Sequence, residues 1–252
     1  MSGSDKSFLV LCFAVLLMCF GSCCLAAGAD GQGGVQPYQD PRFVAIPQGV
    51  TQCGPACFYM IFNFYGAHQR FKECDLSGHP ERDTANHGRI SRDTAVCKWI
   101  NSGRFTGTSF SQLKRAADGL HAPGESQPYF LSEACEETTE HGVSEDEAKR
   151  ERILMDIKKR YLDRNRPVII HLRRVWYLPG HYLVLTGYDP KKEKVYYADP
   201  NRGTTGSIDR NSFISEKWYV SPSNTADYYR ARWDGEWFGF YVREPGQRKQ
   251  GT

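Results

Sequence analysis

The sequence has little net charge for its size, since 32 basic and 29 acidic residues leave a formal charge of +3 over 252 residues. No block of lysines and arginines stands out, so the composition gives no reason to expect nucleic acid or an anionic membrane surface as a partner. Paired CxxC motifs, a glycine-rich phosphate loop and internal repeats are also missing. Their absence argues against a zinc-ribbon protein, a P-loop nucleotide-binding protein and a repeat protein.

The one long apolar run lies at the N-terminus. Residues 8–20 are all apolar, Lys6 precedes them, and small residues follow, including an A-x-A pattern at 27–29. A basic start, an apolar middle and a small-residue cleavage site are typical of a secretory signal peptide. We therefore expect residues 1–29 to be a signal peptide, and the protein to be exported to the periplasm or the extracellular space. The sequence leaves three alternatives open: a retained membrane anchor, a bacterial lipoprotein signal ending at Cys23, and a buried helix.

The cysteine count agrees with export. Four of the nine cysteines lie in the signal region. The other five are Cys53, Cys57, Cys74, Cys97 and Cys135. An odd number in an exported protein predicts one thiol outside the disulfides. If Cys53 is that thiol, the other four could form two disulfides, and the sequence does not choose the pairing. Alternatively, Cys57 is a buried thiol inside a helix.

Residues 48–66 are the stretch around which we expect the fold to be organised. Pro55 suits the first turn of a helix, where its missing N–H would have no partner. Residues 57–65 are largely apolar on all sides, which predicts a buried helix. Gly66 suits a left-handed cap at the end of that helix. Cys53 would then lie at the start of the helix.

A cysteine in this position can act as a nucleophile. The unpaired N–H groups and the positive end of the helix dipole favour the thiolate form of Cys53. The same N–H groups can stabilise an oxyanion, and Gln48 could add a side-chain N–H, with the adjacent Gln52 as the less favoured donor. A lone cysteine at a helix start is more often a small buried residue. A catalytic role therefore depends on a matching histidine and acid downstream.

Beyond residue 66, the sequence predicts helices first and strands later. Polar connecting loops are predicted at 67–90 and 121–142. Helices are predicted at 93–101, 110–117 and 144–165. Strands are predicted at 167–172, 181–186, 194–198, 217–220 and 236–242. This order indicates an α+β domain with its N-terminal core helix packed on an antiparallel β-sheet. We place the domain at 43–243, after a flexible leader at 30–42 and before a disordered tail at 244–252.

Two of the predicted strands form a hairpin that carries a histidine and an acid. His181 begins the first strand, residues 189–193 form a polar turn, and Asp199 ends the second strand. If Tyr188 pairs near Lys194, Asp199 lies one diagonal step from His181 on the same face of the sheet. Diagonal neighbours on adjacent strands lie within side-chain reach of each other.

This hairpin geometry predicts a triad. Asp199 would accept a hydrogen bond from one imidazole nitrogen of His181 and leave the other nitrogen facing Cys53. Asn201 is an alternative orienting residue, and Asp189, on the turn, is less favoured. Two plainer explanations stay open at this point: a histidine with satisfied hydrogen bonds at a strand end, and an Asp-Pro pair that only forms a turn.

Three blocks of sequence carry a family resemblance. They are, in order, Q-x4-CGPAC at 48–57, GHYLVLTGY at 180–188 and YADP at 197–200. Together they resemble the bacteriocin-processing cysteine peptidases, papain-like enzymes that remove double-glycine leaders. The resemblance implies a papain-like fold and a peptide or protein substrate. It also implies catalytic roles for four residues: Cys53 as nucleophile, His181 as base, Asp199 as its orienting residue, and Gln48 in the oxyanion hole.

We therefore predict an exported, monomeric, papain-like cysteine peptidase that needs no metal or organic cofactor. The N-terminus would attach it to a membrane if residues 1–29 are retained or lipidated. One alternative is an amidase or transpeptidase that uses the same site. Another is a catalytically silent peptide-binding module. The sequence does not identify the substrate, although residues 176–178, just before His181, could line a cleft.

Overall fold

The computed structural model describes residues 36–49, 52–67, 71, 95–100, 107–122, 124–135, 147–174, 180–215, 219–220 and 230–244. All of them belong to one compact unit, Gly34–Thr252. Four features of the sequence analysis lie wholly or largely outside these residues: the signal peptide, the loop at 67–90, residues 176–178 and the C-terminal tail.

The α+β class predicted from the sequence is confirmed. The α-helices are α2 (Cys53–Phe64), α4 (Ala95–Ile100), α5 (Phe110–Asp118), α6 (Glu147–Arg160) and α7 (Arg210–Ile214). Two short 3-10 helices are η1 (Pro37–Gln39) and η5 (Leu162–Arg164). The strands are β1 (Phe130–Cys135), β2 (Val168–Arg174), β3 (His181–Asp189), β4 (Lys194–Asp199), β5 (Thr204–Asp209), β6 (Tyr219–Val220) and β7 (Arg230–Val242).

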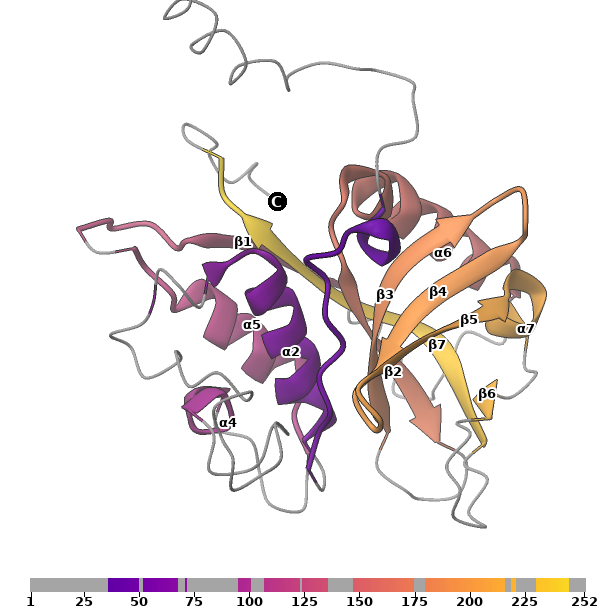
Figure 1. Ribbon diagram of the computed structural model, residues 1–252, viewed down its shortest axis with the longest axis horizontal. Helices are drawn as coiled ribbons and strands as arrows, with labels where there is room; N and C mark the ends of the chain where they lie inside the picture. The colour runs from indigo at the N-terminus through magenta and orange to yellow at the C-terminus, as the bar shows by residue number, and fades with distance from the viewer. Residues whose placement is uncertain are drawn as a thin grey trace, which may run out of the picture. The chain divides into compact units, whose positions relative to one another are not determined.

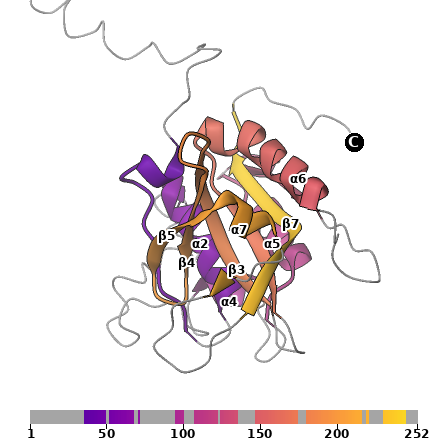
Figure 2. The same cartoon turned by 90° about the vertical axis from the view of Figure 1, so that its right-hand side faces the viewer.

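The strands form one sheet in the order β1-β7-β2-β3-β4-β5, and β6 pairs with β7. Every pairing in it is antiparallel, as predicted. Figure 1 shows α2 and α5 together on one side of the sheet, and Figure 2 shows α6 running beside β7. The sheet thus separates two helical layers, and each layer has a hydrophobic core of its own.

Helix α2 forms the centre of the first core. From Gly54 to Phe62 all of its residues are buried, which is the environment that its apolar sequence predicted. The Phe58 ring stacks on Phe240 of β7 at a centroid distance of 4.7 Å. Gly66 has a φ of 66°, so it caps the helix in the left-handed region that glycine tolerates. Because each buried apolar side chain stabilises a fold by about 1.5–3 kcal/mol, this helix holds Cys53 firmly in place.

Helix α6 covers the opposite face of the sheet. Leu154 and Ile157, from the apolar stripe that predicted this helix, are fully buried against β2 and β7. Phe213 of α7 joins the same core and stacks on Trp233 at 4.8 Å. A second core thus supports the sheet from this face.

Two strands and one helix were not predicted. β1 lies inside the stretch 121–142, which the sequence assigned to a polar loop. β5 and the short α7 follow Asp199 in a polar segment. The backbones of β1 and β5 pair with β7 and β4, and partner strands can hold a polar segment that lacks strand periodicity of its own. Strand β7 also begins at Arg230, earlier than the predicted residue 236.

Residues 36–42, here called the N-terminal strap, differ from the flexible leader expected there. The Gln36 side-chain amide pairs with the backbone of Tyr188, accepting from its N–H at 2.6 Å and donating to its carbonyl at 3.0 Å. The Tyr38 ring stacks on Tyr196 of β4 at 3.9 Å. A Cβ at Gly187 would lie 2.0 Å from Tyr38, so only glycine allows this close approach. The strap therefore packs on the β3–β4 hairpin.

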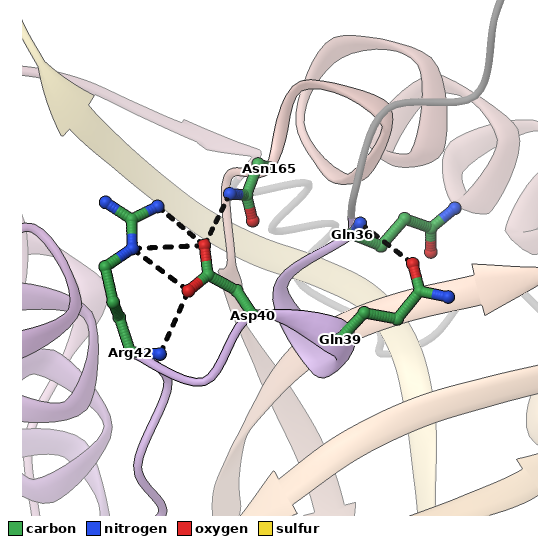
Figure 3. Close-up of polar contacts among 5 residues, drawn as sticks. All are labelled: Gln36, Gln39, Asp40, Arg42 and Asn165. Atoms are coloured by element: carbon green, nitrogen blue, oxygen red, sulfur yellow. Dashed lines mark hydrogen bonds and ion pairs between the residues drawn. The ribbon is translucent and has the colours of Figure 1, made fainter.

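A polar network completes the strap (Figure 3). The Asp40 carboxylate accepts hydrogen bonds from the Arg42 guanidinium and from Asn165 Nδ2, the latter at 2.8 Å. The hydrogen bonds from Arg42 hold the pKa of Asp40 well below its usual value, so this carboxylate is charged at neutral pH. Asn165 follows η5 in sequence, so the network joins the strap to the segment between α6 and β2.

No disulfide joins the described cysteines to one another. Cys53, Cys57, Cys97 and Cys135 carry thiols in the structure, and Cys74 lies outside the described residues. The described residues thus show neither of the two disulfides that the sequence allowed. Cys135 packs against the core on the opposite face of the sheet from Cys57 and Cys97, so the sheet separates it from both of them. The alternative that the sequence left open for Cys57, a buried thiol inside a helix, is the one observed: Cys57 is fully buried within α2.

Among the described segments, no helix has the length and apolar character that crossing a membrane requires.

Candidate active site

The β3–β4 hairpin forms as predicted, but with one extra residue in β3. At the turn, Asp189 rather than Tyr188 pairs with Lys194, so the register there differs by one position from the expected one. A β-bulge around Thr186 then shifts the register by one residue. Beyond the bulge, the pairing returns to the register that the sequence argument assumed.

This bulge decides which face of the sheet Asp199 occupies. Past the bulge, Val184 lies opposite Ala198, and the same register continued to the strand ends puts His181 and Asp199 on one face. A shift of one residue moves every side chain of a strand to the other face. Without the extra residue in β3, therefore, Asp199 would point away from His181.

His181 and Asp199 form a buried hydrogen-bonded pair. The distance from His181 Nε2 to Asp199 Oδ1 is 2.8 Å, and the two residues are only 4% and 3% exposed. The backbone N–H of Asn201 also donates to Asp199 Oδ1, at 2.8 Å. Because Nε2 of His181 is occupied by Asp199, Nδ1 is the nitrogen left for the hydrogen bond with Cys53.

Cys53 is the first residue of α2 and is partly buried. Its sulfur accepts hydrogen bonds from the backbone N–H groups of Gly54 and Tyr182, besides its bond with His181. A Cβ at Gly54 would lie 2.7 Å from Thr108 Cβ, so only glycine lets the helix start approach the segment before α5 this closely. The sequence analysis did not find these contributions, because Thr108 belongs to no motif and Tyr182, although it lies in the block at 180–188, acts through its backbone.

The electrostatics of the site favour a thiolate and an imidazolium. Burial raises the pKa of Cys53, but the hydrogen bond and charge of His181 and the two backbone N–H groups outweigh it, so this pKa is lowered. Burial lowers the pKa of His181, but its hydrogen bonds and charge interactions with Asp199 and Cys53 raise it to about 9. Each group thus favours the charged form of the other.

A second cysteine on the same helix behaves in the opposite way. Cys57 lies one turn after Cys53 and is fully buried. Burial raises its pKa well above the ordinary value, and the nearby charges of Cys53 and Asp199 raise it further. Cys57 is therefore a neutral thiol at any physiological pH, and of these two cysteines only Cys53 has the environment of a nucleophile.

Gln48 lies beside the turn that follows Asp199. Its backbone N–H donates to the carbonyl of Pro200 at 2.6 Å. Its neighbour Pro47 packs against Gly203, which has a φ of 62° and whose Cβ would lie 2.6 Å from Pro47 Cδ. Residues 199–203 therefore hold both the acid that binds His181 and the segment that carries Gln48.

The side chains of Gln48 and Gln52, both shortly before Cys53 in the sequence, carry buried polar atoms. Gln52 is 1% exposed, and neither its Oε1 nor its Nε2 has a hydrogen-bond partner among the described residues. The Oε1 of Gln48 is likewise buried without one. Leaving such a group unpaired costs about 1–3 kcal/mol, which functional sites tolerate more often than structural cores.

The two alternative orienting residues take other positions. Asn201 supports Asp199 through its backbone N–H. Asp189 accepts hydrogen bonds from the backbone N–H groups of Lys191 and Lys192, at the far end of β3 from His181. Asp199 is thus the acid that hydrogen-bonds His181.

Within the segments that the structure describes, no three His, Cys, Asp or Glu side chains are grouped so that they could hold a metal ion.

Comparison with known families gives one match over most of the chain. The Peptidase_C39 like family matches residues 35–225, a span that contains all four candidate site residues. A search of the curated proteins found no match. The span begins at the strap and includes the β3–β4 hairpin, so the match covers both halves of the site.

Proposed function

Because the chain belongs to the Peptidase_C39 like family, we propose that it is a cysteine peptidase that hydrolyses peptide bonds through Cys53, His181 and Asp199. The observation that carries this proposal is the buried hydrogen bond between His181 and Asp199, and the lowering of the pKa of Cys53 by its hydrogen bond and charge interaction with His181 supports it. A family match gives the general class of protein, and the geometry of these groups supports the specific chemistry.

In the first half of the reaction, the Cys53 thiolate attacks the carbonyl carbon of the substrate. A C–S bond forms, and the carbonyl electrons move to oxygen to give a tetrahedral oxyanion. The His181 imidazolium then donates its proton to the leaving nitrogen as the C–N bond breaks. The amine product departs and a thioester to Cys53 remains.

In the second half, water hydrolyses the thioester. Neutral His181 takes a proton from the water as its oxygen attacks the carbonyl carbon, and a second tetrahedral oxyanion forms. Collapse of that oxyanion breaks the C–S bond and releases the carboxylic acid. The thiolate and the imidazolium are then both restored. Asp199 keeps the imidazole ring oriented and stabilises its positive charge throughout.

The oxyanion would be stabilised by the start of α2 and by Gln48. The N–H groups at a helix N-terminus point at an anion placed there, and the helix dipole adds a favourable field. The Gln48 side-chain amide would supply a further donor, since its segment is fixed to the turn after Asp199. Losing one such donor typically lowers kcat about 100- to 1000-fold.

Cleavage-site profiling of a peptide library tests this function, with two cysteines of one helix as a matched pair. We expect Cys53→Ala to abolish cleavage and Cys57→Ala to retain it, because Cys57 is a buried neutral thiol. Circular dichroism would show that both variants are folded. Product analysis separates hydrolysis from acyl transfer, since a transpeptidase forms a new amide instead of a free acid. Full cleavage by folded Cys53→Ala would refute the proposal.

We also propose that the protein works after export. The support is the N-terminal sequence alone, with its apolar run at 8–20 and small residues at 27–29. N-terminal sequencing of protein recovered from the periplasm or medium should find a chain that begins within residues 27–30. A mature protein that still begins at Met1, or that is lipidated at Cys23, would point to membrane attachment instead.

A further inference from the structure

A second histidine–carboxylate pair lies next to the first one. His171 of β2 is opposite Tyr182 of β3 in the sheet, one position from the pair formed by Leu172 and His181. The distance from His171 Nδ1 to Glu236 Oε2 is 2.8 Å, and both side chains are about one-fifth exposed. No motif of the family resemblance includes either residue, and the proposed mechanism does not use them.

The His171 ring packs against both neighbours of His181. A Cβ at Gly180 would lie 1.8 Å from His171 Nε2, so the chain just before His181 lies directly against this ring. The Tyr182 ring lies 5.0 Å from the His171 ring, centroid to centroid. Tyr182 is also the residue whose backbone N–H donates to the Cys53 sulfur. Movement of the His171 ring would therefore reach the backbone on both sides of His181.

Strand β7 is distorted in a way that brings Glu236 to His171. Ile170 pairs with Trp237, and Leu172 pairs with Trp233. Residues 234–236 of β7 therefore lie opposite His171 alone. Gly235, in the middle of this bulge, has a φ of 93°, which only glycine adopts readily. Bulges commonly redirect a side chain beside an active site, at the cost of ladder hydrogen bonds.

The bulge is held in place by its own contacts. The Trp233 indole N–H donates to the backbone carbonyl of Glu236 at 3.0 Å, and Trp233 itself is 2% exposed. The hydrogen bond with His171 lowers the pKa of Glu236, and burial opposes this effect only in part. Glu236 is therefore a fixed carboxylate, and it can orient His171 as Asp199 orients His181.

We propose that His171 and Glu236 are positioning residues of the peptidase site: Glu236 fixes the His171 ring, and the ring fixes the Gly180–Tyr182 backbone so that His181 stays in reach of Cys53. This inference rests on the proposed function. Neither residue touches the reacting atoms, so each acts through the placement of His181. A misplacement of about 1 Å from a mutation away from the chemistry can cost about 100-fold in rate, which leaves room for a large effect.

The test uses Glu236→Gln and His171→Ala, with Glu133→Gln as the control. Glu133 of β1 is also a partly buried carboxylate on this sheet, but it lies on the edge strand, opposite Gly239 of β7, and its partners are Arg160 and Tyr161 Oη, the latter at 2.8 Å. Three quantities are measured for each folded variant: the melting temperature, the pH at which Cys53 becomes reactive toward iodoacetamide, and kcat and KM for a peptide substrate.

We expect both test variants to lower kcat about 10- to 100-fold with KM nearly unchanged, because the loss is in the transition state rather than in binding. Cys53 should become reactive only at higher pH, since a displaced imidazolium stabilises the thiolate less. The control should change the melting temperature alone. If the test variants likewise change only the melting temperature, the pair is structural and the inference is wrong.

Two features of this design keep the result interpretable. If His171→Ala does not fold, Glu236→Gln still answers the question, because it preserves the side-chain shape and removes only the charge. The alkylation profile reports the Cys53–His181 contact without any substrate. It therefore tests the positioning role even if Cys53→Ala were to retain cleavage, an outcome that would refute only the peptidase function.

Discussion

Replacing Asp199 by Asn should narrow the pH range of the peptidase from both sides. In the folded protein the pKa of His181 is raised from 6.5 to about 9, and Asp199 is the first of the two groups that raise it. At 1.36 kcal/mol for each pH unit, this rise corresponds to about 3 kcal/mol in favour of the imidazolium. Losing an opposite charge at hydrogen-bond distance typically shifts a pKa by about 1–3 units.

The two limbs of the pH profile follow from the sign of each shift. In the wild type, the ion pair forms above the lowered pKa of Cys53 and persists until His181 loses its proton near pH 9. In Asp199→Asn the imidazolium is less favoured, so the alkaline limb of kcat should move to lower pH. The thiolate then has a weaker partner, so alkylation of Cys53 should begin at higher pH, about tenfold slower near neutral pH.

The assay combines the pH dependence of iodoacetamide labelling with that of peptide cleavage. Mass spectrometry would assign the label to Cys53 and show Cys57 unmodified in the folded protein, given its raised pKa. The matched control is Asp189→Asn, which removes an acid from the other end of β3, where it caps the turn and pairs with Lys192. If Asp199→Asn leaves both limbs where the wild type and the control have them, the electrostatic account of the site is wrong.

Three further predictions concern positions that shape the site. Gly203→Ala should strain a left-handed residue and push Pro47 away, which should lower kcat at least about tenfold. The control is Gly124→Ala, because Gly124 has a φ of 79° but open space around it; this variant should cost only about 1 kcal/mol of stability, measured by urea unfolding. Gly54→Ala should lower the rate of Cys53 alkylation by displacing the start of α2, and adding Thr108→Ala should restore most of the rate; no restoration would show that this contact is irrelevant. Tyr38→Ala should lower stability by about 2–4 kcal/mol through loss of its stack on the hairpin while kcat changes little, and a large drop in kcat with unchanged stability would contradict a purely structural strap.

The elements that carry their own periodicity or caps were the ones that the sequence predicted well. Helices α2 and α5 and strands β2, β3 and β4 lie close to their expected bounds, because apolar patterning and flanking glycines or turn residues encode them locally. Strands β1 and β5 carry few such signals, and their backbone hydrogen bonds to β7 and β4 hold them in the sheet. The strap at 36–42 was missed for the same reason, since its tyrosine and glutamine contacts come from β3 and β4.

By itself, the sequence determined which residue types are available for chemistry and where the local structure puts them: a cysteine at a helix start, a histidine at the start of a strand and an aspartate at the end of the next. The tertiary structure decided whether they meet. An extra residue in β3 puts His181 and Asp199 on the same face of the sheet. Packing of α2 in its core brings Cys53 to the start of β3, where His181 lies. A bulge in β7 puts Glu236 beside His171. The face of a sheet on which a side chain lies depends on the register of its strand. Register depends on pairing between segments that are distant in the chain, and local sequence patterns do not encode that pairing.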